Sequence, residues 1–584
     1  MVFTAPAWVP QLPFDPPDSI PISEFMLNEK YGRHPLGRSK PPFTCGLTGA
    51  EYSATEVRDR VDKLARALSQ ELTWTPNGGT EWDKVAGVFS VNTIDTLTLT
   101  WAIHRLSGIS SPANAAYSRF ELVHQLKSSG AKALFTCVPL LSLALEAASE
   151  CGIPRKHIYL LPVAKVFSGG VEVPTEFKTV DQLIELGDSL PPIEELRWAK
   201  GQGARQTALL CYSSGTSGLP KGVMIAHRNV IANVLQCATY EKPHRDSLIK
   251  SGKGPETETV LGLLPQNHIY SLVVICHSHP YRGDQIINLP KFEIRQFLQS
   301  VQQYRINNLY LVPPIIIAMT KNKPLCSKYD LSSVTGIYTG AAPLGQETAE
   351  EMVKQHPRWK IRQGYGMTET STVVLSTAAD DIWFGSSGSL LPAVEAKLLS
   401  TEGTEINQYD KPGELVIKSP SSVLGYLNNE TATRETFQHG WVRTGDEAVV
   451  RVGPKGTEHI FIVDRIKELI KVKGFQVAPA ELEAHLLTHP AVADAAVIPV
   501  SDDAAGELPK AFIVKSSSVG LENNDRLLMR DIQKHVEREK ARHKWLKGGV
   551  EFIDVIPKSP SGKILRRMLR DRERESRRQK GPKL

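Results

Sequence analysis

The segment YSSGTSGLPKG (212–222) decides the fold of this chain, because it places hydroxyl groups, glycines and a lysine directly after an apolar run at 208–210. Glycines allow tight turns and a close approach of the backbone to a ligand. Backbone N–H groups and hydroxyls can then surround phosphate oxygens, while Lys221 supplies a positive charge. The segment therefore predicts a strand followed by a loop that binds the polyphosphate of a nucleoside triphosphate.

Two other interpretations of this loop are weaker. A Walker-type P-loop requires Gly-Lys followed by Ser or Thr, whose hydroxyl binds magnesium. Here Pro220 precedes Lys221 and Gly222 follows it, which excludes that motif. A flexible Ser/Gly linker is the second alternative, but such linkers usually lack flanking apolar strands.

Length and composition indicate a globular protein of more than one domain. A chain of 584 residues is too long for one hydrophobic core, so we expect at least two. Its 41% hydrophobic and 23% charged residues are typical of soluble proteins. No apolar run is long enough to cross a bilayer, and the proline-rich start (1–21) lacks the regions of a secretory signal.

The cysteines favour a reducing compartment. They are odd in number, scattered and without a CxxC pair, which argues against a zinc site or a disulfide framework. The seven are Cys45, Cys137, Cys151, Cys211, Cys237, Cys276 and Cys326.

The net charge of +6 is concentrated at the C-terminus, where residues 563–584 contain ten Lys/Arg and three Asp/Glu. A basic tail can bind nucleic acid or an anionic membrane. However, no aromatic residues interleave with it, and Arg and Glu alternate at 572–575. We therefore expect a solvated helix end and no nucleic-acid partner.

Strand-like and helical stretches alternate along the chain, which predicts an α/β fold with parallel-rich sheets. Residues 52–68 form an amphipathic pattern with its apolar positions on one stripe. A second helix is expected at 93–106. The expected strands are 85–90, 133–137, 208–213, 261–265 and 307–313.

A domain boundary is predicted near Lys467, where the composition turns basic (464–473). The predicted units are a large N-terminal domain (1–466) and a small, mobile α+β lid domain (467–584). The expected elements of the lid are helices at 479–487 and 524–542 and strands at 493–500, 510–514 and 550–556.

The segment GYGMTET (364–370) carries further nucleotide chemistry. Two glycines flank Tyr365, which predicts a turn that presents an aromatic plane to an adenine ring. Thr368 and Glu369 add a hydroxyl and a carboxylate. Magnesium takes few carboxylates and relies on substrate oxygens, so Glu369 is the candidate metal ligand.

Three charged residues are candidates for ribose and phosphate binding. Asp446 ends the turn WVRTGD (441–446), where a carboxylate can accept hydrogen bonds from ribose hydroxyls. Arg465 could hold ribose or phosphate oxygens. Lys563 lies in the loop of PKSPSGKILRRML (557–569), and a lysine on a mobile loop can deliver charge to a developing phosphate.

Taken together and in this order, these motifs resemble those of the adenylate-forming superfamily: acyl-CoA synthetases, 4-coumarate:CoA ligases, firefly luciferase and peptide-synthetase adenylation domains. The resemblance covers roughly residues 45–570. GAAPLG (340–345), QGYGMTE (363–369) and DRIKELIKVKGFQVAPAELE (464–483) are most similar to 4-coumarate:CoA ligases. The overall pattern resembles a fungal aryl- or acyl-CoA ligase.

This resemblance implies a two-step reaction that uses ATP, Mg²⁺ and coenzyme A. A carboxylic acid first forms an acyl-AMP with release of pyrophosphate. The lid then rotates, and the CoA thiol displaces AMP to give a thioester. Three alternatives stay open: a luciferase-like oxygenase, a stand-alone adenylation enzyme that loads a carrier protein, and a non-catalytic relative.

The resemblance also implies roles for individual residues. The phosphate loop consists of Ser213, Ser214, Gly215, Thr216, Ser217, Gly218 and Lys221. The adenine, the ribose and the junction with the acyl pocket are contacted by Ala342, Gln363, Gly364, Tyr365, Asp446 and Arg465. The acyl pocket is lined by His268, Tyr270, Val274, Tyr338, Gly340, Ala341, Gly364, Val373 and Val374.

The remaining implied roles concern catalysis and lid movement. Thr368 contacts the α-phosphate, Glu369 binds magnesium, Lys563 is the adenylation lysine, and His268 guards the carboxylate before moving to open the thiol channel. After rotation about Lys467, the lid presents a second face to the site. The residues of that face are Lys471, Lys473, Gly474 and Gln476, and which half-reaction Lys471 or Gln476 serves stays open.

The sequence allows two classes of acid substrate and two cellular compartments. Val274 and Val374 are apolar and Tyr338 departs from the plant pattern, so an aryl acid and a medium-chain fatty acid fit equally. The terminal Pro582-Lys583-Leu584 resembles the Ser-Lys-Leu peroxisomal signal, with Pro582 in place of the small residue. We expect a peroxisomal enzyme that binds the import receptor; the alternative is the cytoplasm.

Overall fold

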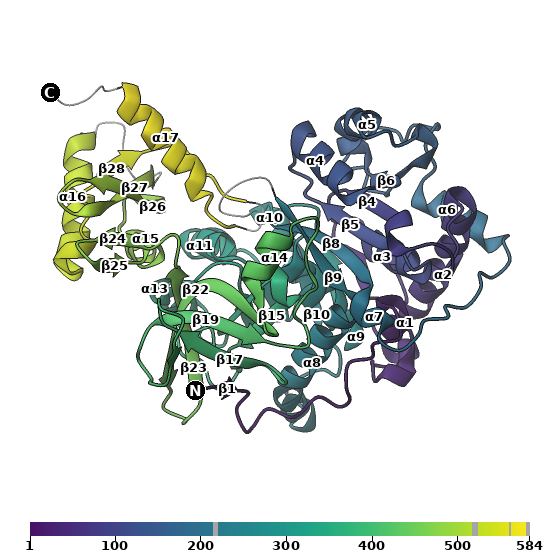
Figure 1. The fold of residues 1–584 in the computed structure, drawn as a ribbon, viewed down its shortest axis with the longest axis horizontal. Coiled ribbons are helices and arrows are strands. Elements are labelled where there is room, and N and C mark those ends of the chain that lie inside the picture. The colour runs from purple at the N-terminus through teal and green to yellow at the C-terminus, as the bar shows by residue number, and fades with distance from the viewer. Residues whose placement is uncertain (214–219, 517–523, 560–561, 580–584) are drawn as a thin grey trace.

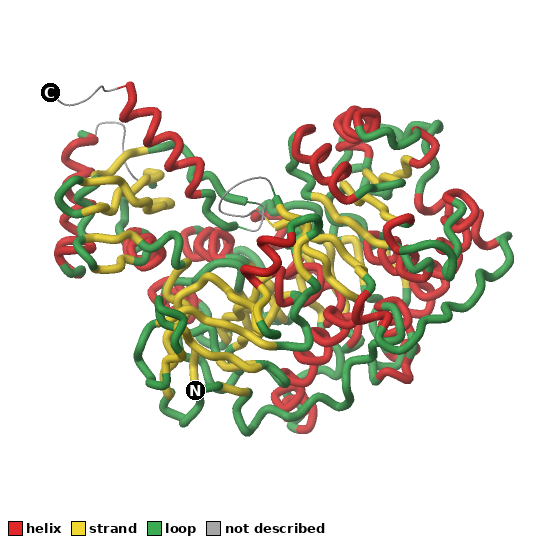
Figure 2. Tube along the Cα trace, in the orientation of Figure 1, coloured by secondary structure: helices red, strands yellow, loops and turns green. Residues whose placement is uncertain are grey.

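The computed structural model describes residues 1–213, 220–516, 524–559 and 562–579. Figure 1 shows a large body and a smaller C-terminal domain at one side of it. The body contains three sheets, and Figure 2 shows helices packed around them. The α/β fold class and the separate C-terminal unit confirm the predicted architecture.

The first sheet has the strand order β20-β9-β8-β5-β4-β6-β7. Its members β8, β5, β4, β6 and β7 are parallel, while β9 and β20 run antiparallel at one edge. The bounds are β4 (Val85–Phe89), β5 (Ile109–Ala113), β6 (Ala133–Thr136), β7 (Ile158–Leu160), β8 (Thr207–Ser213), β9 (Lys221–Ala226) and β20 (Gly425–Tyr426).

The second sheet has the order β16-β15-β14-β13-β12-β10-β11-β2-β3. The six strands from β14 to β2 are parallel and form its centre. The bounds are β2 (Phe43–Cys45), β3 (Glu51–Tyr52), β10 (Thr259–Gly262), β11 (Gln285–Asn288), β12 (Asn308–Leu311), β13 (Gly336–Thr339), β14 (Lys360–Met367), β15 (Thr372–Ser376) and β16 (Ser389–Leu390).

A third sheet, which the sequence did not predict, is antiparallel throughout. It lies in the green part of the ribbon in Figure 1. Its bounds are β1 (Phe3–Thr4), β17 (Glu395–Leu399), β18 (Glu405–Ile406), β19 (Gly413–Lys418), β21 (Phe437–Gln438), β22 (Trp441–Val452) and β23 (Glu458–Arg465).

Local sequence signals explain the predicted helices. In α2 (Ala54–Leu72), Ser53 and Glu56 form a reciprocal capping box, and the apolar stripe is buried. The other helices of the body are α1 (Ile22–Leu27), α3 (Thr96–Arg105), α4 (Arg119–Ser129), α5 (Leu141–Glu150), α6 (Val180–Asp188), α7 (Gln202–Arg205), α8 (His227–Lys250), α9 (His279–Tyr281), α10 (Ile294–Gln303), α11 (Pro313–Lys321), α12 (Lys323–Cys326), α13 (Gln346–Gln355) and α14 (Glu430–Thr436). A π-helix, η6 (Tyr270–Ser278), precedes α9.

The C-terminal domain has its own hydrophobic clusters, separate from that of the body. Its sheet contains β24 (Ile470–Val472), β25 (Phe475–Val477), β26 (Val492–Asp502), β27 (Gly506–Lys515) and β28 (Gly549–Phe552). Its helices are α15 (Pro479–Leu486), α16 (Asp525–Glu539) and α17 (Arg566–Gln579). Lys467 is exposed between β23 and β24, and a boundary at this residue stays a prediction. Across the described ranges, no helix combines the length and the apolar character needed to cross a membrane.

Candidate active site

The phosphate-loop residues that the structure describes lie at one edge of the first sheet. β8 ends at Ser213 and β9 begins at Lys221, and these two residues pair across the strands. The Lys221 ammonium lies 5.1 Å from the centre of the Tyr426 ring on β20. Ser214, Gly215, Thr216, Ser217 and Gly218 are outside the described residues.

Tyr426 also joins this edge to the predicted metal ligand. Its hydroxyl donates a hydrogen bond of 2.7 Å to Glu369 Oε1, and both side chains are largely buried. Glu369 belongs to a 3₁₀ turn, η7 (Thr368–Thr370), which Thr368 begins. Lys221, Tyr426 and the Glu369 carboxylate therefore form a continuous polar group between the first two sheets.

The candidate ribose site is built from two neighbouring strands of the third sheet. Asp446 on β22 and Arg465 on β23 are directly paired, with 3.8 Å between Asp446 Oδ1 and Arg465 Nε. Tyr365 donates a 2.6 Å hydrogen bond to the other oxygen of Asp446. Burial raises the pKa of Asp446, while Arg465 and the Tyr365 hydroxyl oppose that rise. The structure thus brings together three residues that lie far apart in the sequence.

The prediction of a turn around Tyr365 is wrong. Residues 360–367 form β14, which pairs with β15 through a register shift between Tyr365 and Gly366. A Cβ at Gly366 would lie only 1.6 Å from the carbonyl oxygen of Thr372. The glycine is therefore explained by this close approach of two strands, and not by a turn.

The loop of the C-terminal domain that carries Lys563 reaches the same site. Burial, together with the positive charge of Arg465, lowers the pKa of Lys563 to about 8. Burial also lowers the pKa of His268 to about 4, and the charge of Lys563 contributes to this shift. Lys563 also acts on the pKa of Asp446. The lysine thus lies where the ribose candidates and the acyl-pocket histidine meet.

Residues predicted for the acyl pocket converge between η6 and the second sheet. Tyr270 donates a 2.9 Å hydrogen bond from its hydroxyl to the Tyr338 carbonyl oxygen. Within η6, Tyr270 and Val274 retain a small exposed surface, while their neighbours are almost fully enclosed. They are four positions apart, close to one turn of a π-helix, so they share a face.

Glycines and Tyr338 lie together where the acyl pocket is predicted. A Cβ at Gly340 would lie 3.2 Å from the Gly364 carbonyl oxygen and 3.7 Å from the Tyr270 ring, so only glycine fits without a shift of its neighbours. A Cβ at Gly364 would lie 2.1 Å from Tyr338 Oη, which fills the space beneath. The Tyr338 hydroxyl also lies 3.1 Å from Ser376 Oγ.

The structure describes five further predicted residues. Val373 and Val374 are successive on β15, where side chains alternate between faces, so they cannot line the same wall. Val374 has no exposed surface, and the structure does not place it with Val373. Ala341 and Ala342 follow Gly340 and are accessible, and the Gln363 side chain accepts a 3.0 Å hydrogen bond from Leu344 N.

Two residues beside Tyr338 are not predicted from the sequence. Tyr310, Tyr338 and Arg362 occupy matching positions on β12, β13 and β14. The guanidinium of Arg362 lies 5.2 Å from the Tyr338 ring centre and is paired with Glu241. The order of these strands is not readable from the sequence, so no local signal identifies this row.

The second face of the C-terminal domain does not enter the site. Lys471 and Gln476 are paired on β24 and β25, with Lys473 and Gly474 in the connecting turn. All four are exposed to solvent. The lid is therefore oriented with Lys563 at the site and with the other predicted face outside it.

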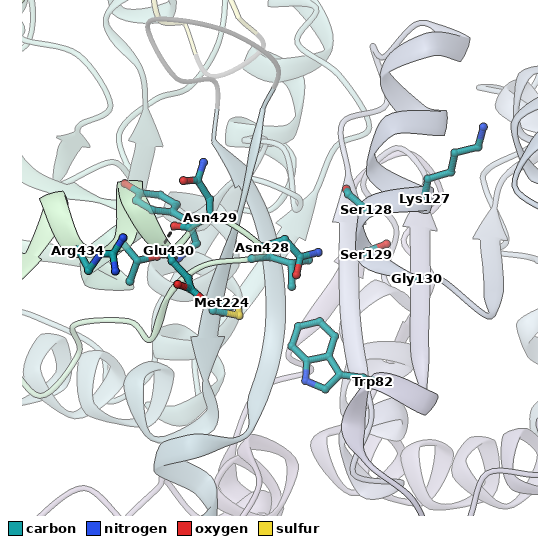
Figure 3. A pocket seen from close by; sticks show the side chains of 13 residues that line it. Trp82, Lys127, Ser128, Ser129, Gly130, Met224, Asn428, Asn429, Glu430 and Arg434 are labelled. Atoms are coloured by element: carbon teal, nitrogen blue, oxygen red, sulfur yellow. Dashed lines mark hydrogen bonds between the residues drawn. The ribbon is translucent and has the colours of Figure 1, made fainter.

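A groove with a volume of about 690 Å³ lies beside the nucleotide site (Figure 3). It is bordered by α4 on one side and by the segment from Tyr426 to α14 on the other. Its lining includes Trp82, Lys127, Asn428, Glu430 and Arg434. Tyr426 lines this groove and also contacts Glu369, so the groove adjoins the phosphate edge from outside.

Two family models together match most of this chain. Residues 37–427 match the family described as AMP-binding enzyme, and residues 481–563 match the AMP-binding enzyme C-terminal domain. An acyl-CoA ligase of Emericella nidulans (easD) is 42% identical, covering 98% of this chain and 100% of the relative. An acyl-CoA ligase of Cordyceps militaris (cm3C) is 40% identical, covering 98% and 90%.

Solved structures show the same fold. The anthranilate CoA ligase AuaEII in complex with anthranoyl-AMP superimposes with a TM-score of 0.79 at 22% identity, covering 95% of this chain and 98% of that one. A benzoate CoA ligase from Burkholderia xenovorans gives 0.75 at 21% identity, covering 94% and 100%.

Proposed function

The chain belongs to the AMP-binding enzyme family, and we propose that it activates a carboxylic acid with ATP and transfers the acyl group to coenzyme A. Its relatives over nearly the whole chain are named acyl-CoA ligases, so an AMP-forming acid:CoA ligase is the supported activity. The observation that carries the proposal is the position of Lys563. The charge of Lys563, which belongs to a separate domain, is close enough to affect the pKa of Asp446 and of His268, and this supports a role for the lysine in adenylation.

The described residues fit a nucleotide. Asp446 and Arg465 would hold the ribose, the Tyr365 ring would cover the adenine beside Ala342, and Lys221 with Ser213 would approach the terminal phosphates. The hydrogen bond from Tyr365 fixes one Asp446 oxygen and leaves Oδ1 toward the arginine. The pyrophosphate end of the nucleotide would thus lie near Tyr426 and Glu369.

The donor set near Glu369 fits magnesium. One carboxylate oxygen accepts from Tyr426, and in the described part of the chain no group of three or more metal-ligating side chains surrounds it. Magnesium typically binds one or two carboxylates and takes its other ligands from phosphates and water. The ion would neutralise charge on the phosphates when it is bound there.

Adenylation follows from the residues around Lys563. The substrate carboxylate would approach the α-phosphate between Thr368 and His268. Because burial holds the pKa of His268 at about 4, its ring is neutral at physiological pH and does not repel a cationic Lys563. The ammonium of Lys563 would offset the negative charge that builds on the phosphoryl oxygens as pyrophosphate leaves.

Thioester formation requires the other face of the lid. Rotation about Lys467 would withdraw Lys563 and bring in Lys471, Lys473, Gly474 and Gln476, which are now exposed. The CoA thiol would then enter past His268 and attack the acyl carbon, with AMP as the leaving group. Which of Lys471 and Gln476 acts in which half-reaction is a matter for mutagenesis.

The acyl pocket supports an acid with an apolar or aromatic body. Tyr270, Val274, Val373 and the bare backbone at Gly340 offer apolar surface, and Tyr338 limits the depth. We propose an aryl acid or a medium-chain fatty acid.

A screen of carboxylic acids for pyrophosphate release, with and without CoA, tests the function. A ligase gives acid-dependent pyrophosphate release and an acyl-CoA product that appears only with CoA. Light or oxygen consumption would identify a luciferase-like oxygenase, and adenylate formation without CoA transfer would identify a carrier-loading enzyme. No pyrophosphate release with any acid would contradict adenylation itself.

We also propose import into the peroxisome through Pro582-Lys583-Leu584, which lies outside the described residues. The basic residues Arg577 and Arg578 directly upstream support the proposal, because they favour docking to an acidic receptor groove. Fusing residues 575–584 to a fluorescent protein in a fungal cell tests it. A punctate signal that becomes diffuse when Leu584 is deleted is expected, and a diffuse signal from the intact fusion would contradict import.

A further inference from the structure

Lys321, at the C-terminal end of α11, is a body residue that forms hydrogen bonds to the lid. Its ammonium donates hydrogen bonds of 2.8 Å to the Val492 carbonyl oxygen and 2.9 Å to the Ala493 carbonyl oxygen. Both acceptors are at the start of β26 in the C-terminal domain. The contact therefore joins two domains that must separate when the lid rotates.

A β-bulge explains why these carbonyl groups are available. Val492 pairs with Lys515 and Asp494 pairs with Val514, so Ala493 is an extra residue in the ladder between β26 and β27. A bulged residue is left out of the regular pairing, and the local bend redirects its neighbours. Lys321 supplies donors at the point where the ladder is interrupted.

The next residue, Asp494, continues the connection toward the catalytic loop. Its Oδ2 atom lies 2.6 Å from the ammonium of Lys558, and both side chains are partly buried. Lys558 forms a β-bridge with Ile564, and Ser559 N donates a 2.8 Å hydrogen bond to the Lys563 carbonyl oxygen. Lys563 is thus carried by a small hairpin whose first strand is held by Asp494.

The hairpin also packs directly against the body. Gly562 has a φ of +81°, and a Cβ there would lie 3.2 Å from both Val312 Cγ2 and Pro314 Cδ. These two residues flank the start of α11, and Lys321 is at its other end. The same helix therefore contacts the lid at the hairpin and at the bulge.

We propose that Lys321 is a positioning residue for adenylation, which acts through Asp494 and Lys558 to hold Lys563 in the site. The contact exists in the orientation that has Lys563 inside and the face around Lys471 outside. Because a rotated lid cannot keep it, Lys321 stabilises this orientation alone. This inference rests on the proposed function, since it concerns the first of the two half-reactions.

The test compares the two half-reactions in the full-length enzyme. Lys321→Met removes the donors and keeps the length of the side chain. We expect acid-dependent ATP–pyrophosphate exchange to fall about 3- to 10-fold, the size expected for one partly exposed charged contact. Thioester formation from presynthesised acyl-AMP and CoA should be unchanged or faster. Lys321→Arg, which keeps a cationic donor, should restore most of the exchange.

Two further variants separate positioning from a general structural role. Lys328→Met is the matched control: it removes another exposed lysine that has no side-chain partner among the described residues, and it should behave like the wild type. Asp494→Asn should lower exchange in the same way as Lys321→Met. Adding Lys321→Met to Lys563→Ala should cause no further loss, because residues that act through one another are not additive.

The outcomes are distinct. Normal exchange in Lys321→Met, equal losses in both half-reactions, or a full multiplicative loss in the double variant would overturn the inference. Preserved thioester formation shows that a variant is folded. A wild-type enzyme without exchange for any acid would instead contradict the proposed function.

Discussion

Among single residues, Lys563 is notable because its ammonium is shielded from solvent and lies near a second positive charge, Arg465. Burial and the charge of Arg465 keep its pKa at about 8, so a substantial fraction of the free enzyme loses this charge at mildly alkaline pH. Its contribution therefore depends both on the loop that carries it and on the pH.

Replacing Lys563 with alanine should strongly lower the rate of adenylation and leave the rate of the second half-reaction largely unchanged. The lost charge stabilises only the first step, and such contacts typically contribute about 2.7–4 kcal/mol to a barrier. Pyrophosphate exchange and thioester formation from presynthesised acyl-AMP measure the two steps separately. Equal losses in both would refute the idea of two lid orientations.

The adenylation rate should also fall as the pH rises through about 8. A lysine with a lowered pKa is cationic below that pH and neutral above it, so charge stabilisation is lost on the alkaline side. The profile of kcat/KM for ATP reports this pKa in the free enzyme. In Lys563→Arg, whose guanidinium stays charged, any residual exchange should lack this alkaline limb; a limb that persists would assign it to another group.

Residue identities were predictable where the chemistry is local. Glycines, hydroxyls and Lys221 in one run indicate phosphate binding, and Glu369 follows Thr368 within one motif. Tyr310 and Arg362 were not predictable, because they reach Tyr338 only through the order of strands β12, β13 and β14. The Tyr426 contact with Glu369 likewise depends on pairing between β20 and β9, far apart in the chain.

Two elements lead to predictions: the segment between β23 and β24, where a hinge is proposed, and the row of side chains across β12–β14. The first contains Lys467, and Glu468 N donates a 2.8 Å hydrogen bond to the Arg465 carbonyl oxygen around it. The second places Tyr338 between the acyl pocket and Arg362.

Lys467→Pro should restrict the hinge, because proline fixes φ and removes a backbone donor. We expect near-normal pyrophosphate exchange and a collapse of CoA-dependent turnover, since the enzyme begins in the adenylation orientation. Lys467→Ala, which leaves φ free, is the control and should keep both activities. Loss of exchange as well would indicate misfolding or a hinge at another residue.

Tyr338→Ala should admit longer or bulkier acids, because it removes the ring that fills the space beneath Gly364. The acid panel measures the change as a shift in kcat/KM between short and long acids. Tyr338→Phe keeps the ring and should keep the original preference. An unchanged profile in Tyr338→Ala would exclude this residue from the pocket wall.

Helices and strands with a clear periodic pattern of apolar residues were predicted correctly, whereas the third sheet was not. The capped, amphipathic α2 and the buried strands β4 and β8 follow from their own sequences. The antiparallel third sheet was missed. β1 joins it through a long-range pairing with β17, but the strands from β17 to β23 pair with near neighbours in the sequence, so most of this sheet was missed although its contacts are local. The glycines around Tyr365 do not mark a turn: a close approach of two strands requires Gly366, and the Tyr338 hydroxyl fills the space at Gly364.

For the whole molecule, buried histidines set the response to acid. Burial lowers the pKa of His104 to about 3 and that of His268, His277 and His279 to about 4. In the unfolded chain each would titrate near 6.5, so the unfolded state binds more protons at moderately acidic pH. The contribution of these neutral histidines to the free energy of unfolding is therefore complete above about pH 6.5. It is lost as the pH falls toward their pKa values in the folded protein.

The free energy of unfolding should thus decrease steadily from pH 6.5 to pH 5, by an amount that approaches about 3 kcal/mol per histidine only near pH 4. Denaturant unfolding at intervals across this window measures it, and the interval from pH 8 to pH 7 serves as the reference. Buried carboxylates such as Asp95 and Glu483, whose pKa burial raises, act in the opposite direction, so the measured change is the sum of the two effects. A stability that is constant down to pH 5 would contradict the prediction.

Lys563 and the pair Lys471–Gln476 belong to the same domain, and in this structure Lys563 is shielded from solvent while the pair is exposed. Under the rotation proposed above, an acyl-AMP would have to wait for a domain movement before a thiol could reach it. That waiting time would set how often the mixed anhydride escapes or hydrolyses, so the ATP consumed per thioester would depend on the speed of the rotation and on how firmly the first orientation is held.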